Sequence, residues 1–283
     1  MGAHRVSRKL VSGAFNPNQN FLSFVEIIER ELPLVCAGNQ IEPLHQLRVT
    51  LRRLRNGFWI YKHELPRRSL VLWKKGIREA SKPCGQCRDL DVQIQYLENM
   101  MKGVSVKEAE EFKVLINRLQ QKRLRKHRAM HTALVKFRRG NVLKSLKRFF
   151  MSPQGLSLDT RRNFTQGQVS TRYQKLYLSA TPFPEEGDVV GLHQMRIQAK
   201  RLRYTLEFFK RLDRQITGKT IQRVIDLQRV LGQIHDFDVW QAEWTNPPRQ
   251  LLSECRQARQ QGYLRLRTLW KGFISDTGQQ LRA

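Results

Sequence analysis

The segment HQLRVTLRRLRNGFWIYK, residues His45 to Lys62, occurs again as HQMRIQAKRLRYTLEFFK, residues His193 to Lys210. The two copies lie 148 residues apart, and seven of their eighteen positions are identical. A second pair of blocks follows them, GQCRDLDV from Gly85 and GQIHDFDV from Gly232. Because both the order and the spacing of the blocks repeat, the sequence predicts two related half-domains.

Each copy also has the periodicity of an α-helix. Apolar residues of the first copy recur every three or four positions, as on one helix face: Leu44, Leu47, Leu51, Leu54 and Phe58. The chain has only 17 glycines and 10 prolines in 283 residues, fewer than the roughly 12% that is usual. The sequence therefore predicts an all-α fold. We expect a single domain, residues 16–278, that forms a helical bundle. Its two pseudo-twofold-related halves, 16–151 and 156–278, would surround a basic cavity or groove.

Helix breaks are expected where glycine, proline and small polar residues cluster. These clusters lie near residues 16–20, 36–43, 65–66, 83–85, 152–158, 181–191 and 245–248. A turn at 83–85, and another at Gly232, would make Asp89 and Asp236 helix N-caps, each followed by a second aspartate in the first turn. On this interpretation the aspartates are structural, and Asp89 and Asp236 could also pair with nearby arginines.

A row of basic side chains borders the apolar face of each repeated helix. At about 100° per residue these side chains share one arc beside the leucines, so helix docking would carry them toward neighbouring helices. We expect them to line a shared groove or cavity, together with a third basic row at i, i+4 and i+7. The predicted binding residues are His45, Arg48, Arg52, Arg55, His193, Arg196, Lys200 and Arg203, with Arg118, Lys122 and Arg125 from the third row.

The chain as a whole is strongly basic, with 52 Lys and Arg against 24 Asp and Glu, a net charge of +28. Like charges one helical turn apart repel each other, and a cleft of low dielectric strengthens the repulsion. A polyanion would reverse this effect, and arginine forks suit phosphate oxygens. The sequence therefore favours a phosphate-rich polyanion as ligand. We expect neither a catalytic residue nor a metal or cofactor.

The expected location of the protein in the cell rests on targeting and membrane-spanning segments, which we do not find in the sequence. We find no signal-peptide pattern and no apolar run of 18 residues, so we expect a cytoplasmic protein without a membrane partner. Four cysteines are too few for a disulfide scaffold, which favours a reducing compartment. Cys84 and Cys87 form a single CxxC, and we expect buried thiols there.

Two other functions stay open at this point. The net charge of +28 suits RNA as well as other polyanions. The dipeptide His235-Asp236 is also found in metal-dependent phosphohydrolases that assemble His and Asp ligands on helices. Arg88 occupies the matching position of the first repeat, however, and an arginine cannot serve as the equivalent ligand.

The four blocks together resemble the CHAD family, α-helical domains named for their conserved histidines. The resemblance covers nearly the whole chain, and LHQMRIQAKRLRYTLEFF, residues 192–209, carries it most specifically. It implies a helical bundle with internal pseudosymmetry and a basic central cavity that binds inorganic polyphosphate, often at polyphosphate granules. Polyphosphate-metabolising enzymes are then candidate partners. Some members carry an N-terminal CYTH domain, and we expect this chain to be a stand-alone module.

Overall fold

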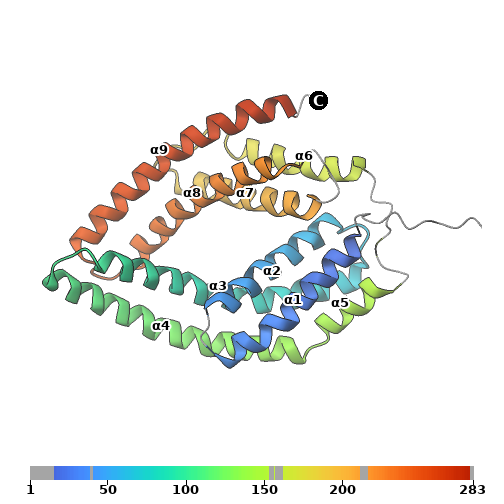
Figure 1. The fold of residues 1–283 in the computed structure, drawn as a ribbon, viewed down its shortest axis with the longest axis horizontal. Coiled ribbons are helices and arrows are strands. Elements are labelled where there is room, and N and C mark those ends of the chain that lie inside the picture. Colours follow the sequence, from blue (N-terminus) through green and yellow to red (C-terminus); the bar gives the residue numbers. More distant parts are fainter. Residues whose placement is uncertain (1–15, 39–40, 153–155, 157–161, 211–215, 281–283) are drawn as a thin grey trace, which may run out of the picture.

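The computed structural model describes residues 16–38, 41–152, 156, 162–210 and 216–280 (Figure 1). Within these ranges the chain forms nine helices and no strand, which confirms the all-α prediction. The first five helices are α1 (Pro17–Ala37), α2 (Ile41–Ile60), α3 (Arg67–Met101), α4 (Val106–Arg139) and α5 (Val142–Met151). The remaining four are α6 (Arg162–Leu178), α7 (Val189–Phe209), α8 (Gly218–Glu243) and α9 (Arg249–Gln280).

Local sequence signals explain where several helices begin. The side chain of Asn16 accepts hydrogen bonds from the backbone of the first turn of α1, and Thr217 does the same for α8. Ser105 and Glu108 form a reciprocal capping box at the start of α4. Such caps satisfy backbone N–H groups that have no partner within the helix.

The helices form two groups that follow the chain order (Figure 1). Helices α1 to α5 lie together, and helices α6 to α9 lie together beside them. The two repeated helices, α2 and α7, pack against each other where the groups meet. The pseudo-twofold relation of the halves stays a prediction, and the proposed boundary at residues 152–158 lies mostly outside the described residues.

The larger hydrophobic core contains the apolar faces that the repeat predicted. Leu47, Leu51 and Leu54 of α2 are fully buried in it, as are Met195 and Leu202 of α7. The core explains the glycine in the first repeat. A Cβ atom on Gly57 would lie 2.7 Å from the ring of Phe21, so a larger residue there would displace the packed ring.

A smaller hydrophobic core joins the far ends of the two groups. It includes Leu97 of α3, Phe112 of α4, Trp240 of α8 and Cys255 of α9, all buried. The halves therefore contact each other at this second core as well as at the packed pair α2 and α7.

The break predicted at residues 83–85 is wrong. Helix α3 continues through Pro83 and Gly85, and α8 likewise continues through Gly232. The proline removes one backbone hydrogen bond, but Ala80, Cys84 and Cys87 on either side of it are fully buried, so packing holds the helix together. The aspartates that follow lie in the interior of their helices and are not N-caps.

The second aspartate of each repeated block holds an arginine from the next helix. Asp91 of α3 accepts a hydrogen bond from Arg123 of α4 at 3.0 Å, and Asp238 of α8 accepts one from Arg259 of α9 at 2.6 Å. Since the two pairs occupy matching places, the repeated sequence fixes how each helix pair is held.

Replacing Arg123 with methionine should lower the free energy of unfolding by about 3–5 kcal/mol, because it removes the cation that pairs with the buried Asp91. Urea unfolding followed by circular dichroism would measure the change. Adding Asp91→Asn should restore part of the loss, whereas Lys122→Met, which breaks a half-exposed pair with Glu243, should cost less than about 1 kcal/mol. Equal losses in Arg123→Met and Lys122→Met would contradict the prediction.

Candidate functional site

A cavity of about 810 Å³ lies where helices α2, α3, α4, α7 and α8 come together. Its wall contains eight lysines and arginines, two histidines and three carboxylates, so it carries a formal excess of five positive charges when every lysine is protonated. The basic residues are His45, Arg48, Arg52, Arg88, Lys122, Lys126, Arg196, Lys200, Arg229 and His235, and the acidic ones are Asp89, Asp236 and Glu243.

The structure brings six of the eleven predicted binding residues to this cavity. Both repeated helices contribute to the wall, as their matching sequences suggested. The six are His45, Arg48, Arg52, Lys122, Arg196 and Lys200. Those that are not among the lining residues are Arg55, Arg118, Arg125, His193 and Arg203.

The packing of α2 on α7 explains why the basic rows leave the cavity wall. Past Arg52 and Lys200 the two helices are joined by an ion pair between Arg53 and Glu207 at 3.1 Å. Glu207 also holds Arg203 at 2.7 Å, and Arg203 donates at 3.4 Å to the lining residue Gln228 without being a lining residue itself. Arg55 lies one turn beyond Arg52 and is exposed.

The basic row of α4 reaches the cavity in a different register from the predicted one. Lys122 and Lys126, one turn apart, line the wall, whereas Arg125 lies about 100° round the helix from Lys126 and is exposed. Arg118 donates instead to the backbone oxygen of Thr245 at 3.3 Å. Lys122 forms an ion pair with Glu243 of α8 at 3.1 Å.

Several lining residues come from the second repeated block, which we had not assigned to the site. Gln86, Arg88 and Asp89 line the cavity from α3, and their counterparts Gln233, His235 and Asp236 line it from α8. The similarity of the two blocks was the signal that could have identified them. Lys126 and Arg229 carry no such signal.

The first aspartate of each block pairs with an arginine of the adjoining repeated helix, as expected. Arg48 contacts Asp89 at 2.8 Å, and Arg196 contacts Asp236 at 3.8 Å. The aspartates therefore orient one arginine from each half toward the cavity, although they do so from helix interiors.

The cations of the cavity are incompletely satisfied. Arg88 Nη1 and Arg196 Nε are buried and have no hydrogen-bond partner among the residues that the structure describes. Burial lowers the pKa of Arg48 and of Arg196. Burial, followed by the charges of Arg196, Arg52 and Arg48, lowers the pKa of Lys200 to about 7. An anion in the cavity would relieve both the missing hydrogen bonds and the repulsion.

The two halves differ at the histidines. His193 lies behind His235, with 3.2 Å between their Nδ1 atoms, so one ring donates and the other accepts. Burial, then the charge of Arg196, lowers the pKa of His235 to about 4. The first half has an arginine, Arg88, at this position, so the two sides of the cavity differ in chemistry.

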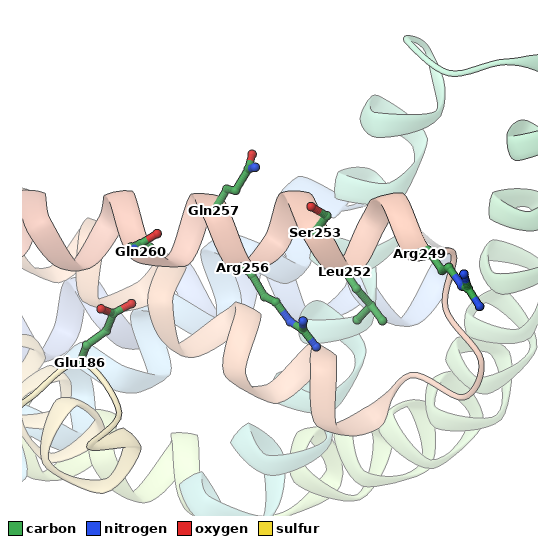
Figure 2. Close-up of a pocket in the computed structure, with 7 residues that line it drawn as sticks. All are labelled: Glu186, Arg249, Leu252, Ser253, Arg256, Gln257 and Gln260. Carbon is green, nitrogen blue, oxygen red and sulfur yellow. The ribbon is translucent and has the colours of Figure 1, made fainter.

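Other features of the described residues give weaker evidence of a functional site than this cavity does. A hollow of about 540 Å³ lies between α9 and Glu186, and the side chains of Arg256 and Gln257 in its lining point in different directions (Figure 2). No three His, Cys, Asp or Glu side chains in the described ranges are grouped to hold a metal ion.

Cys84 and Cys87 are buried free thiols, as expected, and burial raises the pKa of Cys84 to about 12. No helix in the described part combines the length and hydropathy that crossing a bilayer requires.

Comparisons with known proteins agree with this architecture. The CHAD domain family model matches residues 21–245. The structure is similar to the crystal structure of the CHAD domain from the plant Ricinus communis, with a TM-score of 0.66 and 20% identity over 97% of this chain and 96% of that one. It is also similar to PptA from Streptomyces chartreusis, with a TM-score of 0.66 and 13% identity over 90% of this chain and 98% of that one. A search of curated proteins gave no match. Because the family model covers well over half of the sequence, the chain belongs to the CHAD domain family.

Proposed function

We propose that this protein binds inorganic polyphosphate, without turning it over, in the cavity between α2, α3, α4, α7 and α8. The observation that carries the proposal is the excess of five positive charges around one cavity. The buried guanidinium nitrogens of Arg88 and Arg196 that lack partners add unused donors. Phosphate oxygens are strong acceptors for such donors, and a linear polyphosphate presents a negative charge at each unit.

The aromatic side chains favour polyphosphate over RNA. Proteins that bind single-stranded RNA usually stack bases on accessible rings beside the cations. Trp240 is the only Phe, Tyr or Trp among the described lining residues, and it is 5% exposed. Phe58 and Phe209 are fully buried in the larger core. RNA is therefore the second candidate ligand.

A competition titration tests the proposal. Labelled long-chain polyphosphate, bound to the protein, is displaced with unlabelled polyphosphate or with single-stranded RNA at matched ionic strength. We expect polyphosphate to compete much better, and RNA as the better competitor would overturn the proposal. If all eight lining lysines and arginines bind phosphates, the log of the affinity should fall against the log of the salt concentration with a slope of about −6 to −7.

A second assay addresses the phosphohydrolase hypothesis. The protein is incubated with polyphosphate and Mg²⁺ or Mn²⁺, and free phosphate is measured. We expect no release above the level of the uncatalysed reaction. Release that is lost in Asp236→Asn would favour hydrolysis at the His235-Asp236 dipeptide.

The proposal also implies where the protein acts. A protein that binds polyphosphate chains would collect at polyphosphate granules, beside the enzymes that make or degrade the polymer. A fluorescent fusion should then colocalise with granules, and loss of granules should disperse it.

A further inference from the structure

Arg172, on α6, is a buried cation that pairs with no carboxylate in the part of the chain that the structure describes. The residue is 3% exposed, and its guanidinium carbon lies 3.3 Å from the centre of the Trp59 ring. Its Nε finds no hydrogen-bond partner among the described residues. Burial, and then the charge of Arg201, lowers the pKa of Arg172 to about 10. A ring face attracts a cation but offers it no lone pair, so the ring does not satisfy the buried Nε donor.

Two exposed arginines, Arg55 and Arg201, lie next to cavity residues on α2 and α7. Arg55 lies one turn beyond the cavity residue Arg52, and Arg201 follows Lys200 on α7. The partial burial of the Arg55 guanidinium, and then the charges of Arg52, Arg78 and Arg201, lower the pKa of Arg55. Neither Arg55 nor Arg201 pairs with a carboxylate among the described residues.

Helices α2, α6 and α7 meet at this place. Trp59 of α2 contacts Arg172 of α6, and α6 packs along α7. Lys175, one turn after Arg172, lies with its Nζ 5.7 Å from the centre of the same ring. Positive charge from three helices is thus collected next to the cavity.

We propose that a long polyphosphate chain leaves the cavity past Arg52 and continues over Arg55 and Arg201 to a second anion site at Arg172. We call Arg55, Arg201 and Arg172 the exit row. This inference rests on the proposed function and adds to it a dependence on chain length. Tripolyphosphate would bind in the cavity alone, whereas a long chain would bind the cavity and the exit row together.

The test compares tripolyphosphate with long-chain polyphosphate on three proteins. These are the wild type, the double variant Arg55→Gln with Arg201→Gln, and the single variant Arg172→Met. We expect each variant to lose about tenfold or more in affinity for the long chain, as for lost charge-assisted contacts, and to keep its affinity for tripolyphosphate. The salt slope of the double variant for the long chain should be shallower by about 1.4–1.8.

A matched control removes the same charge elsewhere. Arg249 and Arg256 are exposed side chains of α9 (Figure 2), and neither lines the cavity. The double variant Arg249→Gln with Arg256→Gln should bind both ligands nearly as the wild type does. Wild-type affinity for the long chain in the exit-row double variant, or equal losses for both ligands, would overturn the exit row and leave the cavity site intact. Wild-type protein that binds neither ligand would overturn the proposed function itself. Because Arg55 and Arg201 are exposed, their variants decide the matter even if Arg172→Met does not fold.

Discussion

Replacing Arg52 and Lys200 with glutamine should lower the affinity for polyphosphate by about 100-fold or more. The two residues occupy matching positions of the repeat, line one cavity and have no carboxylate partner among the described residues. Each lost charge-assisted contact costs about 1.5–3 kcal/mol, so two contacts correspond to at least that factor. Adding Arg48→Gln and Arg196→Gln should abolish binding. Isothermal titration calorimetry would measure each step.

The same double variant should be slightly more stable than the wild type when no ligand is present. Removing Arg52 and Lys200 relieves repulsion among crowded cations, which should raise the free energy of unfolding by roughly 0.5–1 kcal/mol. Thermal unfolding would show this as a higher midpoint temperature. The variant Arg249→Gln with Arg256→Gln, which removes two charges outside the cavity, is the control. If both double variants lost affinity equally, binding would be a diffuse effect of net charge.

Polyphosphate affinity should fall as the pH is raised above about 7, because Lys200 must be protonated to bind phosphate. Burial and the charges of Arg196 and Arg52 hold its pKa at about 7 in the free protein, and only Asp236 opposes them. Bound phosphate would raise this pKa, so binding takes up a proton. The affinity should be level below that pH and fall up to tenfold per pH unit above it.

Proton uptake gives this prediction a direct measurement. Calorimetric titrations in two buffers of different ionisation enthalpy should differ near neutral pH by the heat of the transferred proton. The variant Lys200→Arg keeps a permanent charge, as Arg52 does at the matching position, and should bind without this pH dependence. Identical pH profiles for the wild type and Lys200→Arg would show that the titrating group lies elsewhere. His235, whose pKa is held at about 4, should add proton uptake only at acid pH.

The lowered pKa of Lys200 also determines whether the stability of the ligand-free protein rises or falls with pH. Its value of about 7 in the folded protein lies below the value of about 10.4 of an unfolded chain, so the unfolded state binds more protons between these limits. The ligand-free protein should therefore become more stable as the pH rises through this window, by at most about 1.4 kcal/mol per pH unit from this group. Lys200→Met should remove this contribution.

The sequence predicted the parts of the site that depend on one helix at a time. The repeat and its leucine spacing placed His45, Arg48 and Arg52 on one arc of α2, and the structure puts all three on the cavity wall. Arg55, on the same arc, is not among the lining residues, because the contact between α2 and α7 limits the cavity there. Helical periodicity contains no information about where a neighbouring helix closes the space.

The helix break wrongly predicted at residues 83–85 shows the same limit of sequence-based prediction. Pro83 and Gly85 are strong local signals for a turn, yet α3 continues through them because buried residues on both sides pack into the core. That error led to the N-cap interpretation of Asp89, whose pairing with Arg48 was nevertheless predicted correctly. Lys126 and Arg229 were missed because only the tertiary arrangement brings α4 and α8 to the same cavity.

The carboxylates of Asp89 and Asp236 have a consequence for which anions the protein accepts. They already contact Arg48 and Arg196, and as tethered groups they act at a high effective concentration. A single orthophosphate that displaces one of them exchanges one anion for another and gains little. A polymer that displaces both aspartates at once still gains its many other contacts with the cavity. The two aspartates therefore make the protein select anions of many charges over single orthophosphate ions.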